Sequence, residues 1–313
     1  MRTTGKTSKL FTSVLCPVDF SEHAALALRY GAAIARRTGA SLHPLFVNDP
    51  LLVAAAAAAY DRAALGAASG TELKRYVATS LGPRARGLKV GFHTALGKPA
   101  REAIRQVQAG GHDLLVVGTK GLNGARRLLL GSTTAALLRH SPVPVLAVPP
   151  AHESGAPSRA PGAAWPGRTI VAAIEFGPRA ADEVLRAAEV ARTFRARLLL
   201  LHVVEVPALP VWLSATGDEH LRRACGEAEA ALEALRGEAR GVKATAIVRV
   251  GHPPDQIATV AAEHGAGLIV MGLRGHEGLF GDRAGACAYQ VLCQGAVPVL
   301  ALPDIRRTLR TRR

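Results

Sequence analysis

The sequence predicts two consecutive copies of a doubly wound α/β domain, each built on a five-stranded parallel sheet. Three observations lead to this fold class. The chain consists of two matching halves, each half alternates strand-like and helical segments, and the strand-like segments are nearly continuous apolar runs, which is typical of parallel strands covered on both faces. With 313 residues, of which 49% are hydrophobic, the chain is long enough for two separate cores.

The repeat consists of five landmarks that occur in the same order in both halves. The first is an apolar run closed by an acidic residue, Asp19 in one half and Glu175 in the other, 156 residues apart. The second is the end of another apolar run, at Val47 and Val203, with the same separation. The other three are separated by 154 residues and comprise 97–99 with 251–253, 114–118 with 268–272, and 142–148 with 296–302.

The segment between the two copies has the composition of a linker. Residues 152–167 are rich in Pro, Gly, Ala and Ser and show no apolar periodicity. We therefore expect a first domain over residues 1–151, a linker over 152–167, a second domain over 168–303 and a basic tail over 304–313.

The elements of the first copy follow from its apolar runs and its capping residues. Ser21 suits the start of a helix and Gly39 its end, while Pro99 favours the first turn of a later helix that Gly110 and Gly111 terminate. The expected strands are 13–18, 41–47, 89–94, 114–117 and 143–148. The expected helices are one between Ser21 and Gly39, an Ala-rich helical region that follows the second strand and ends near Leu81, one from 99 to 109, and one over 132–140. This alternation is that of a Rossmann-like fold, whose ligands bind beyond the carboxyl ends of the strands, where the strand order reverses.

Several classes of protein are disfavoured by the composition. The longest apolar run, 51–60, is about half of what a bilayer-spanning helix needs, and no secretory signal follows the basic N-terminus. The four cysteines include no C-x-x-C pair and are too few for a disulfide framework in a chain of this length. We therefore expect a cytoplasmic protein with no membrane partner and with reduced thiols.

The net charge of +15 is unevenly distributed. Residues 1–151 carry a net charge of +12, residues 168–303 carry −1, and the tail carries +4. A basic chain suggests either nucleic acid or an anionic ligand as partner. Aromatic residues make up only 4% of the chain, which leaves few side chains for base stacking, so nucleic acid is the less favoured partner.

The loop after the fourth strand has the residues of a phosphate-binding loop. Gly118 and Gly121 precede Gly131, Ser132 and Thr133, which open a helix. Glycines let backbone N–H groups approach an anion, and a helix start adds unpaired donors. On their own the glycines would favour a simple turn, but their position between a strand and a helix of a doubly wound unit favours binding instead.

The chain resembles the universal stress protein family, as a tandem with two such domains. The family's ATP-binding signature, G-x2-G-x9-G-(S/T), is matched in full by Gly118, Gly121, Gly131 and Ser132. The resemblance implies ATP as ligand, with Mg2+ left open. By the same resemblance the nucleotide is held at Pro17, Asp19, Val47, Val117, Gly118, Gly121, Gly131, Ser132 and Thr133.

The resemblance also implies how the two copies are arranged. It suggests that they pack about a pseudo-twofold axis through the last strands near Val145 and Val299, and it leaves a homodimer of the whole chain open.

The second copy departs from the signature. The positions that match the first site are Glu175, Val203, Gly272, Gly275 and Gly285, but Ala286 stands where the first copy has Ser132, and acidic Glu277 and Asp282 enter the loop. The longer Glu175 also replaces Asp19. We therefore expect the first site to bind ATP and the second to bind it weakly or not at all.

Three functions remain to be compared. The favoured one is a nucleotide-binding stress-response regulator with little or no turnover. A slow ATP hydrolase or phosphotransferase is the alternative, although the sequence supplies no evident base or paired carboxylates and we assign no catalytic residue. A basic nucleic-acid-associated protein is the second alternative. The eleven histidines are scattered along the chain without metal-ligand spacing, so we assign no metal ligand either.

Overall fold

The computed structural model of the chain describes residues 10–56, 62–119, 130–150, 161, 165–205, 214–273 and 286–303. Most of the expected linker and all of the basic tail (304–313) lie outside these residues, as do Gly121, Gly275 and Gly285. Among the described residues, no helix is both long enough and apolar enough to cross a membrane.

Each half of the chain contains five strands and the helices between them. The first half comprises β1 (Ser13–Val18), α1 (Glu22–Thr38), β2 (Ser41–Asn48), α2 (Pro50–Ala56), α3 (Arg62–Leu81), a 3-10 turn (Gly82–Ala85), β3 (His93–Leu96), α4 (Pro99–Gly110), β4 (Leu114–Gly118), α5 (Ser132–His140) and β5 (Val145–Val148). The second half comprises β6 (Thr169–Ala173), α6 (Ala180–Phe194), β7 (Arg197–Val204), α7 (Ser214–Arg236), β8 (Ala244–Val250), α8 (Pro253–Glu263), β9 (Leu268–Gly272), α9 (Ala286–Gln294) and β10 (Val299–Leu302).

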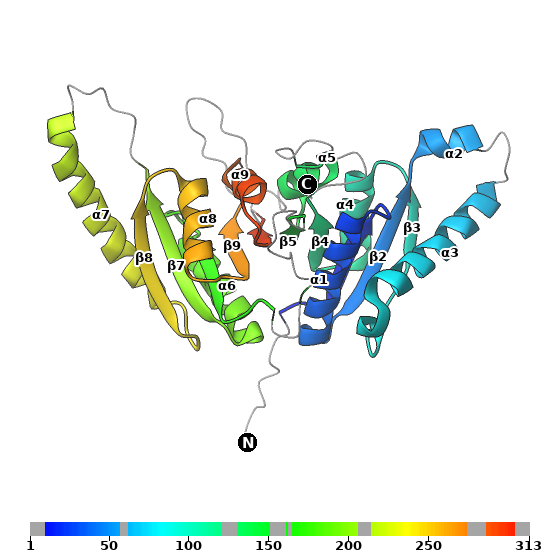
Figure 1. The fold of residues 1–313 in the computed structure, drawn as a ribbon, viewed down its shortest axis with the longest axis horizontal. Coiled ribbons are helices and arrows are strands. Elements are labelled where there is room, and N and C mark those ends of the chain that lie inside the picture. Colours follow the sequence, from blue (N-terminus) through cyan, green and yellow to red (C-terminus); the bar gives the residue numbers. More distant parts are fainter. Residues whose placement is uncertain are drawn as a thin grey trace, which may run out of the picture.

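The ten strands form one continuous sheet in the order β3-β2-β1-β4-β5-β10-β9-β6-β7-β8. All pairs within a half are parallel, as the sequence predicts for a doubly wound domain. The two halves meet where β5 and β10 pair antiparallel, with Leu300 opposite Leu146. Figure 1 shows the two halves on either side of this junction. The two five-stranded sheets are therefore the two ends of a single larger sheet.

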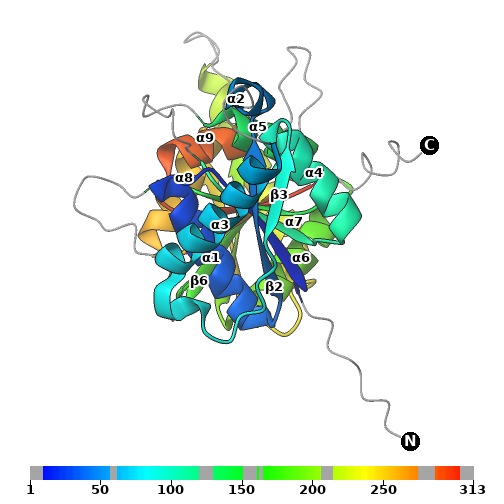
Figure 2. The same cartoon turned by 90° about the vertical axis from the view of Figure 1, so that its right-hand side faces the viewer.

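Helices cover both faces of the sheet (Figures 1 and 2). One apolar core lies under α1, α3 and α6 and includes buried residues of both halves, such as Leu28 and Val184. The other lies under α4, α5, α8 and α9, where Leu137 and Val260 are fully buried. Because both faces are covered, the central strands β4 and β5 are buried along their whole length, which accounts for their continuous apolar sequences.

The capping residues act as the sequence indicates. The Ser21 side chain accepts a hydrogen bond from the backbone N–H of Ala24 and so caps α1, and Gly39 ends that helix with a left-handed φ of 73°. Pro99 opens α4, and Gly111 ends it with φ of 64°. These residues fix the bounds of α1 and α4, which in turn set the positions of β1, β2 and β4.

Two strands of the first half are shorter than the sequence predicts. The third strand begins at His93 rather than at residue 89, and Val90 makes only an isolated bridge to Leu42. Gly91 interrupts this segment and provides no side chain for packing, which weakens a strand. The last strand begins at Val145 rather than at residue 143, because Pro144 just before it has no N–H to donate to a neighbouring strand.

Candidate functional site

The strand order reverses between β1 and β4. From β1 the chain continues to β2 and β3 on one side, whereas β4 and β5 lie on the other. The carboxyl ends of β1 and β4 therefore flank the switch point, where doubly wound proteins bind their ligands. Asp19 follows β1 directly, and Gly118 is the last residue of β4. The structure thus brings these two predicted site residues to neighbouring strand ends.

A tight turn holds Asp19 at the start of α1. The Asp19 Oδ1 atom accepts hydrogen bonds from the Ser21 backbone N–H at 3.1 Å and from the Ser21 hydroxyl at 2.6 Å. Phe20 between them has a left-handed φ of 64°, and the Tyr76 hydroxyl donates to the Ser21 carbonyl at 2.6 Å. Burial and the nearby Asp19 carboxylate raise the pKa of Tyr76, so Tyr76 stays a neutral donor. Asp19 therefore has a fixed position at the sheet edge.

Gly118 lies in close contact with the start of α1. A Cβ atom at this position would be 2.9 Å from the His23 carbonyl oxygen and 3.2 Å from its carbonyl carbon. The Thr134 hydroxyl donates to the Gly118 carbonyl at 2.6 Å and ties α5 to the end of β4. A glycine is required here by the approach of the two backbones, whatever else it does.

Among the residues that the structure describes, no side chain caps the first turn of α5. Gly131 is the N-cap residue, and its N–H donates to the Thr119 carbonyl at 2.8 Å. Ser132 is exposed and Thr133 is half-buried. An N-terminus without a capping side chain leaves backbone donors and the positive end of the helix dipole available to an anion.

The remaining predicted residues of the first half differ in accessibility. Val47, near the end of β2, is half-buried, and Pro17 and Val117 are buried in β1 and β4. Gly121 lies outside the described residues.

The second half presents a more acidic edge. Glu175 comes just after β6, Val203 lies near the end of β7, and Gly272 is the last residue of β9. These three residues therefore occupy the strand ends that correspond to those of the first half. Cys287 on α9 stands at the position of Thr133, next to Ala286 at the position of Ser132. Burial, then the charges of Glu175 and Glu205, raise the pKa of Cys287 to about 11. The hydroxyl pair of the first half is thus replaced by an alanine and a thiol that two carboxylates face.

This environment predicts slow alkylation of Cys287. With a pKa of about 11, its thiolate fraction at pH 8 is roughly 100-fold below that of a free cysteine, because only the thiolate reacts. Mass spectrometry after iodoacetamide treatment should show a rate that still increases between pH 8 and 10. Glu175→Gln should accelerate the reaction several-fold, whereas Glu219→Gln on the exposed side of α7 should not. Equal rates for both variants would contradict the electrostatic effect of Glu175 on the thiol.

One contact joins the two halves beside the glycine segment. The Leu130 backbone N–H, just before Gly131, donates to the Tyr289 hydroxyl of α9 at 3.3 Å. In Figure 1, α5 and α9 lie side by side at the junction of the halves. The start of α5 is therefore in contact with both halves of the chain.

The structure also assembles a cluster that the sequence pattern missed. His43, His93 and His112 lie together on the first half, with one ring nitrogen of each within 4.8 Å of the others. They are 50 and 19 residues apart in the sequence, so no spacing rule could have signalled them. Only the register of β2 with β3 reveals their proximity: it pairs Leu45 with His93, and His43 lies two residues before Leu45 on the same face of the strand.

The fold, together with the residues at the carboxyl ends of its parallel strands, defines a tandem protein of the doubly wound α/β class. A family model for the universal stress protein family matches residues 11–149 and again residues 167–303. The chain belongs to the universal stress protein family.

Individual relatives agree with this assignment. Universal stress protein MJ0531 of Methanocaldococcus jannaschii is 27% identical over 142 residues, which cover 44% of this chain and 82% of that relative. A universal stress protein structure from Archaeoglobus fulgidus aligns with a TM-score of 0.66 at 20% identity, covering 95% of this chain and 97% of its own. The structure of PA1789 from Pseudomonas aeruginosa aligns with a TM-score of 0.63 at 21% identity, covering 97% and 98%. The two structures share the fold along the whole tandem.

Proposed function

We propose that the protein is an ATP-binding stress-response regulator with little or no turnover, which binds the nucleotide in its first half and has a degenerate site in its second. Binding would change the contacts of α5 and thereby the surface offered to a partner. We place this action in the cytoplasm, in keeping with a chain whose four cysteines include no C-x-x-C pair and are too few for a disulfide framework.

The observation that carries the proposal is the uncapped N-terminus of α5 beside the strand switch point. Thr134 fixes this helix start over the end of β4, at 2.6 Å from the Gly118 carbonyl. Asp19 stands across the switch point, at the end of β1. Unpaired N–H groups suit a polyphosphate, and a carboxylate suits the hydroxyls of a ribose. The net charge of +12 on residues 1–151 also favours an anionic ligand.

The acidic edge of the second half supports the asymmetry. Glu175 and Glu205 face Cys287 where the first half has Thr133, so a polyphosphate there would meet negative charge instead of a hydroxyl donor. Buried Glu183 also lies close to Gly272, since a Cβ on that glycine would be 2.5 Å from the Glu183 Oε1 atom.

The contact between Leu130 and Tyr289 offers a route from the nucleotide to the second half. A nucleotide that draws Gly131 toward its phosphates would also move the preceding Leu130 N–H, which donates to the Tyr289 hydroxyl. The pairing of β5 with β10 already joins the two halves, so this route requires no second copy of the chain.

Isothermal titration of the full-length chain with ATP tests the proposal. We expect one site per chain, and Asp19→Ala should weaken binding by about 10- to 100-fold, the cost of losing hydrogen bonds to a charged group. Glu175→Ala, the matched variant of the second half, should leave the affinity within about twofold.

Two outcomes would overturn the proposal. A folded chain that produces no heat with ATP, or two sites that Asp19→Ala and Glu175→Ala weaken equally, would contradict it. Phosphate release should be measured on the same samples, because steady hydrolysis that Asp19→Ala abolishes would make the protein an enzyme instead.

A further inference from the structure

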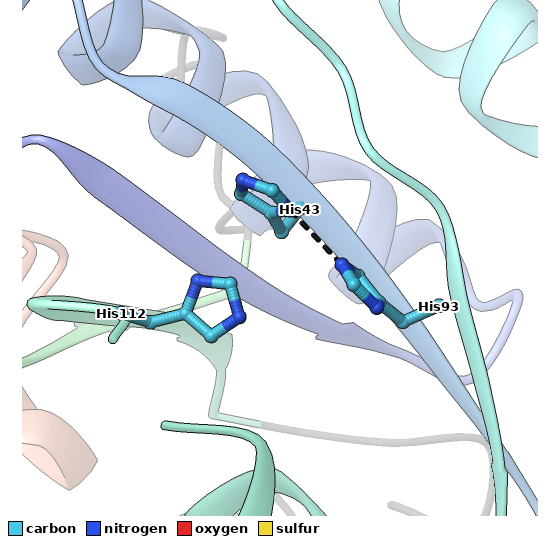
Figure 3. Close-up of side chains that lie close together, drawn as sticks. All are labelled: His43, His93 and His112. Atoms are coloured by element: carbon cyan, nitrogen blue, oxygen red, sulfur yellow. Dashed lines mark hydrogen bonds between the residues drawn. The ribbon is translucent and has the colours of Figure 1, made fainter. Parts of the chain in front are cut away.

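Three imidazole rings converge at the amino ends of the strands, on the edge of the sheet opposite the proposed nucleotide site. His43 lies near the start of β2, His93 begins β3, and His112 precedes β4. Their ring centroids are 4.7 Å apart for His43 and His112, 5.2 Å for His43 and His93, and 5.9 Å for His93 and His112. Figure 3 shows the three rings, which come from three separate segments of the chain.

The nitrogens that face away from the cluster are hydrogen-bonded to serine hydroxyls. His112 Nδ1 lies 2.7 Å from the Ser13 Oγ atom, and His43 Nε2 lies 2.8 Å from the Ser41 Oγ atom. The Ser41 hydroxyl itself donates to the Thr12 carbonyl, so it accepts from His43 Nε2–H. His43 therefore has its lone pair on Nδ1, directed at the cluster. Such outer hydrogen bonds orient the histidine ligands of metal sites.

Of the nitrogens that face the cluster, two are hydrogen-bonded only to each other and one has no partner. His43 Nδ1 and His93 Nε2 are 3.0 Å apart, as the dashed line in Figure 3 marks, and a metal ion would take the place of the proton between them. His112 is only 4% exposed, and its Nε2 atom has no hydrogen-bond partner among the described residues. A buried polar nitrogen without a partner costs about 1–3 kcal/mol. A cation between the three rings would satisfy all of them.

Two glycines keep side chains away from these nitrogens. A Cβ atom at Gly110 would be 2.6 Å from His112 Nε2, and one at Gly91 would be 2.8 Å from His43 Nδ1. Any larger residue at either position would occupy the space in front of a nitrogen lone pair.

A negative charge lies beside the cluster. Asp113 follows His112 directly, and its carboxylate is held in place by hydrogen bonds from the Thr12 and Ser13 backbone N–H groups at 2.8 and 2.9 Å. A carboxylate next to three imidazoles would attract a cation to this end of the sheet.

We propose that His43, His93 and His112 form a zinc-type site, in which each imidazole gives one nitrogen to a divalent transition-metal ion and water completes the coordination. Three imidazole ligands suit Zn2+, Co2+ or Ni2+ and exclude the oxygen-preferring Mg2+ and Ca2+. His43 and His93 are half-buried, which leaves the site accessible from the sheet edge. The ion would fasten the short edge strand β3 to β2 and to the segment before β4.

Metal titration of the full-length chain after EDTA treatment tests this site. We expect one Zn2+ per chain to survive gel filtration, and Co2+ to produce the visible absorption of a tetrahedral nitrogen site. His112→Asn and His93→Asn should each weaken Zn2+ binding at least 100-fold. Gly110→Ala should weaken it without removing a ligand, and His220→Asn, an exposed control on α7, should bind as the parent does.

The outcomes separate a specific site from general affinity for histidines. If the chain retains less than about 0.2 Zn2+, or if the His93 and His112 variants bind like the His220 control, the site does not exist. Near-UV circular dichroism identifies a variant that fails to fold. In that case the half-buried His93 variant decides, and it should keep the parent spectrum while losing the Co2+ absorption.

Discussion

The proposed ATP binding should weaken by more than about 100-fold when Gly118 is replaced by valine. The Cβ atom alone would be 2.9 Å from the His23 carbonyl oxygen, and because the two nearest atoms are backbone atoms of α1, no flexible side chain can move aside to make room. The end of β4 must therefore separate from α1, which moves one side of the strand switch point away from Asp19. A 100-fold loss corresponds to about 2.7 kcal/mol, within the range that overpacking costs, and isothermal titration measures it.

The control for this variant is a glycine without close neighbours. Gly226 lies on α7, and no other part of the described chain comes within 4 Å of the place where its Cβ would lie. Gly226→Ala should therefore leave ATP binding unchanged and stabilise the helix by about 0.5–1 kcal/mol. Gly118→Val should lower the free energy of unfolding, measured with urea, by about 1–3 kcal/mol. If Gly118→Val binds ATP like the parent, the switch point is not where the nucleotide lies.

Leu300→Asp should destabilise the chain by at least about 4 kcal/mol. Leu300 is 3% exposed in the middle of β10 and pairs with Leu146 across the junction of the halves. Removal of a buried leucine costs about 2–5 kcal/mol, and the new carboxylate would be buried without a partner. Since most domains are stable by only about 5–15 kcal/mol, urea unfolding should show a large loss of the folded state.

A matched substitution on the surface isolates the role of the junction. Leu51 in α2 is 80% exposed, so Leu51→Asp should change the free energy of unfolding by less than about 0.5 kcal/mol. Leu300→Ala provides a milder variant if Leu300→Asp does not fold. Comparable stabilities for Leu51→Asp and Leu300→Asp would show that the pairing of β5 with β10 contributes little.

Local signals in the sequence predicted most elements of the fold. Ser21, Gly39 and Gly111 mark helix ends through their own backbone and side-chain chemistry, and the structure confirms each. The same signals failed at Gly91 and Pro144, where one residue inside an apolar run delays the start of a strand. Strand starts depend on which neighbour supplies hydrogen bonds, and this is not encoded in periodicity.

Most features that depend on contacts between distant segments could not be predicted from local sequence patterns. Asp19 and Gly118 could be placed together because parallel strands bring their carboxyl ends to one edge. The histidine cluster and the carboxylates around Cys287 could not, since they arise from the register of β2 with β3 and from the approach of α9 to the end of β6. Register is fixed by packing of the whole sheet, which local patterns do not report.

The covalent link between the halves has a consequence for symmetry. When two identical subunits pair through one strand each, every change in one binding edge appears in both, and dilution separates them. Here β5 and β10 belong to the same polypeptide, so their pairing does not depend on protein concentration. One binding edge is therefore free to diverge while the interface is retained, as the contrast between Ser132–Thr133 and Ala286–Cys287 illustrates.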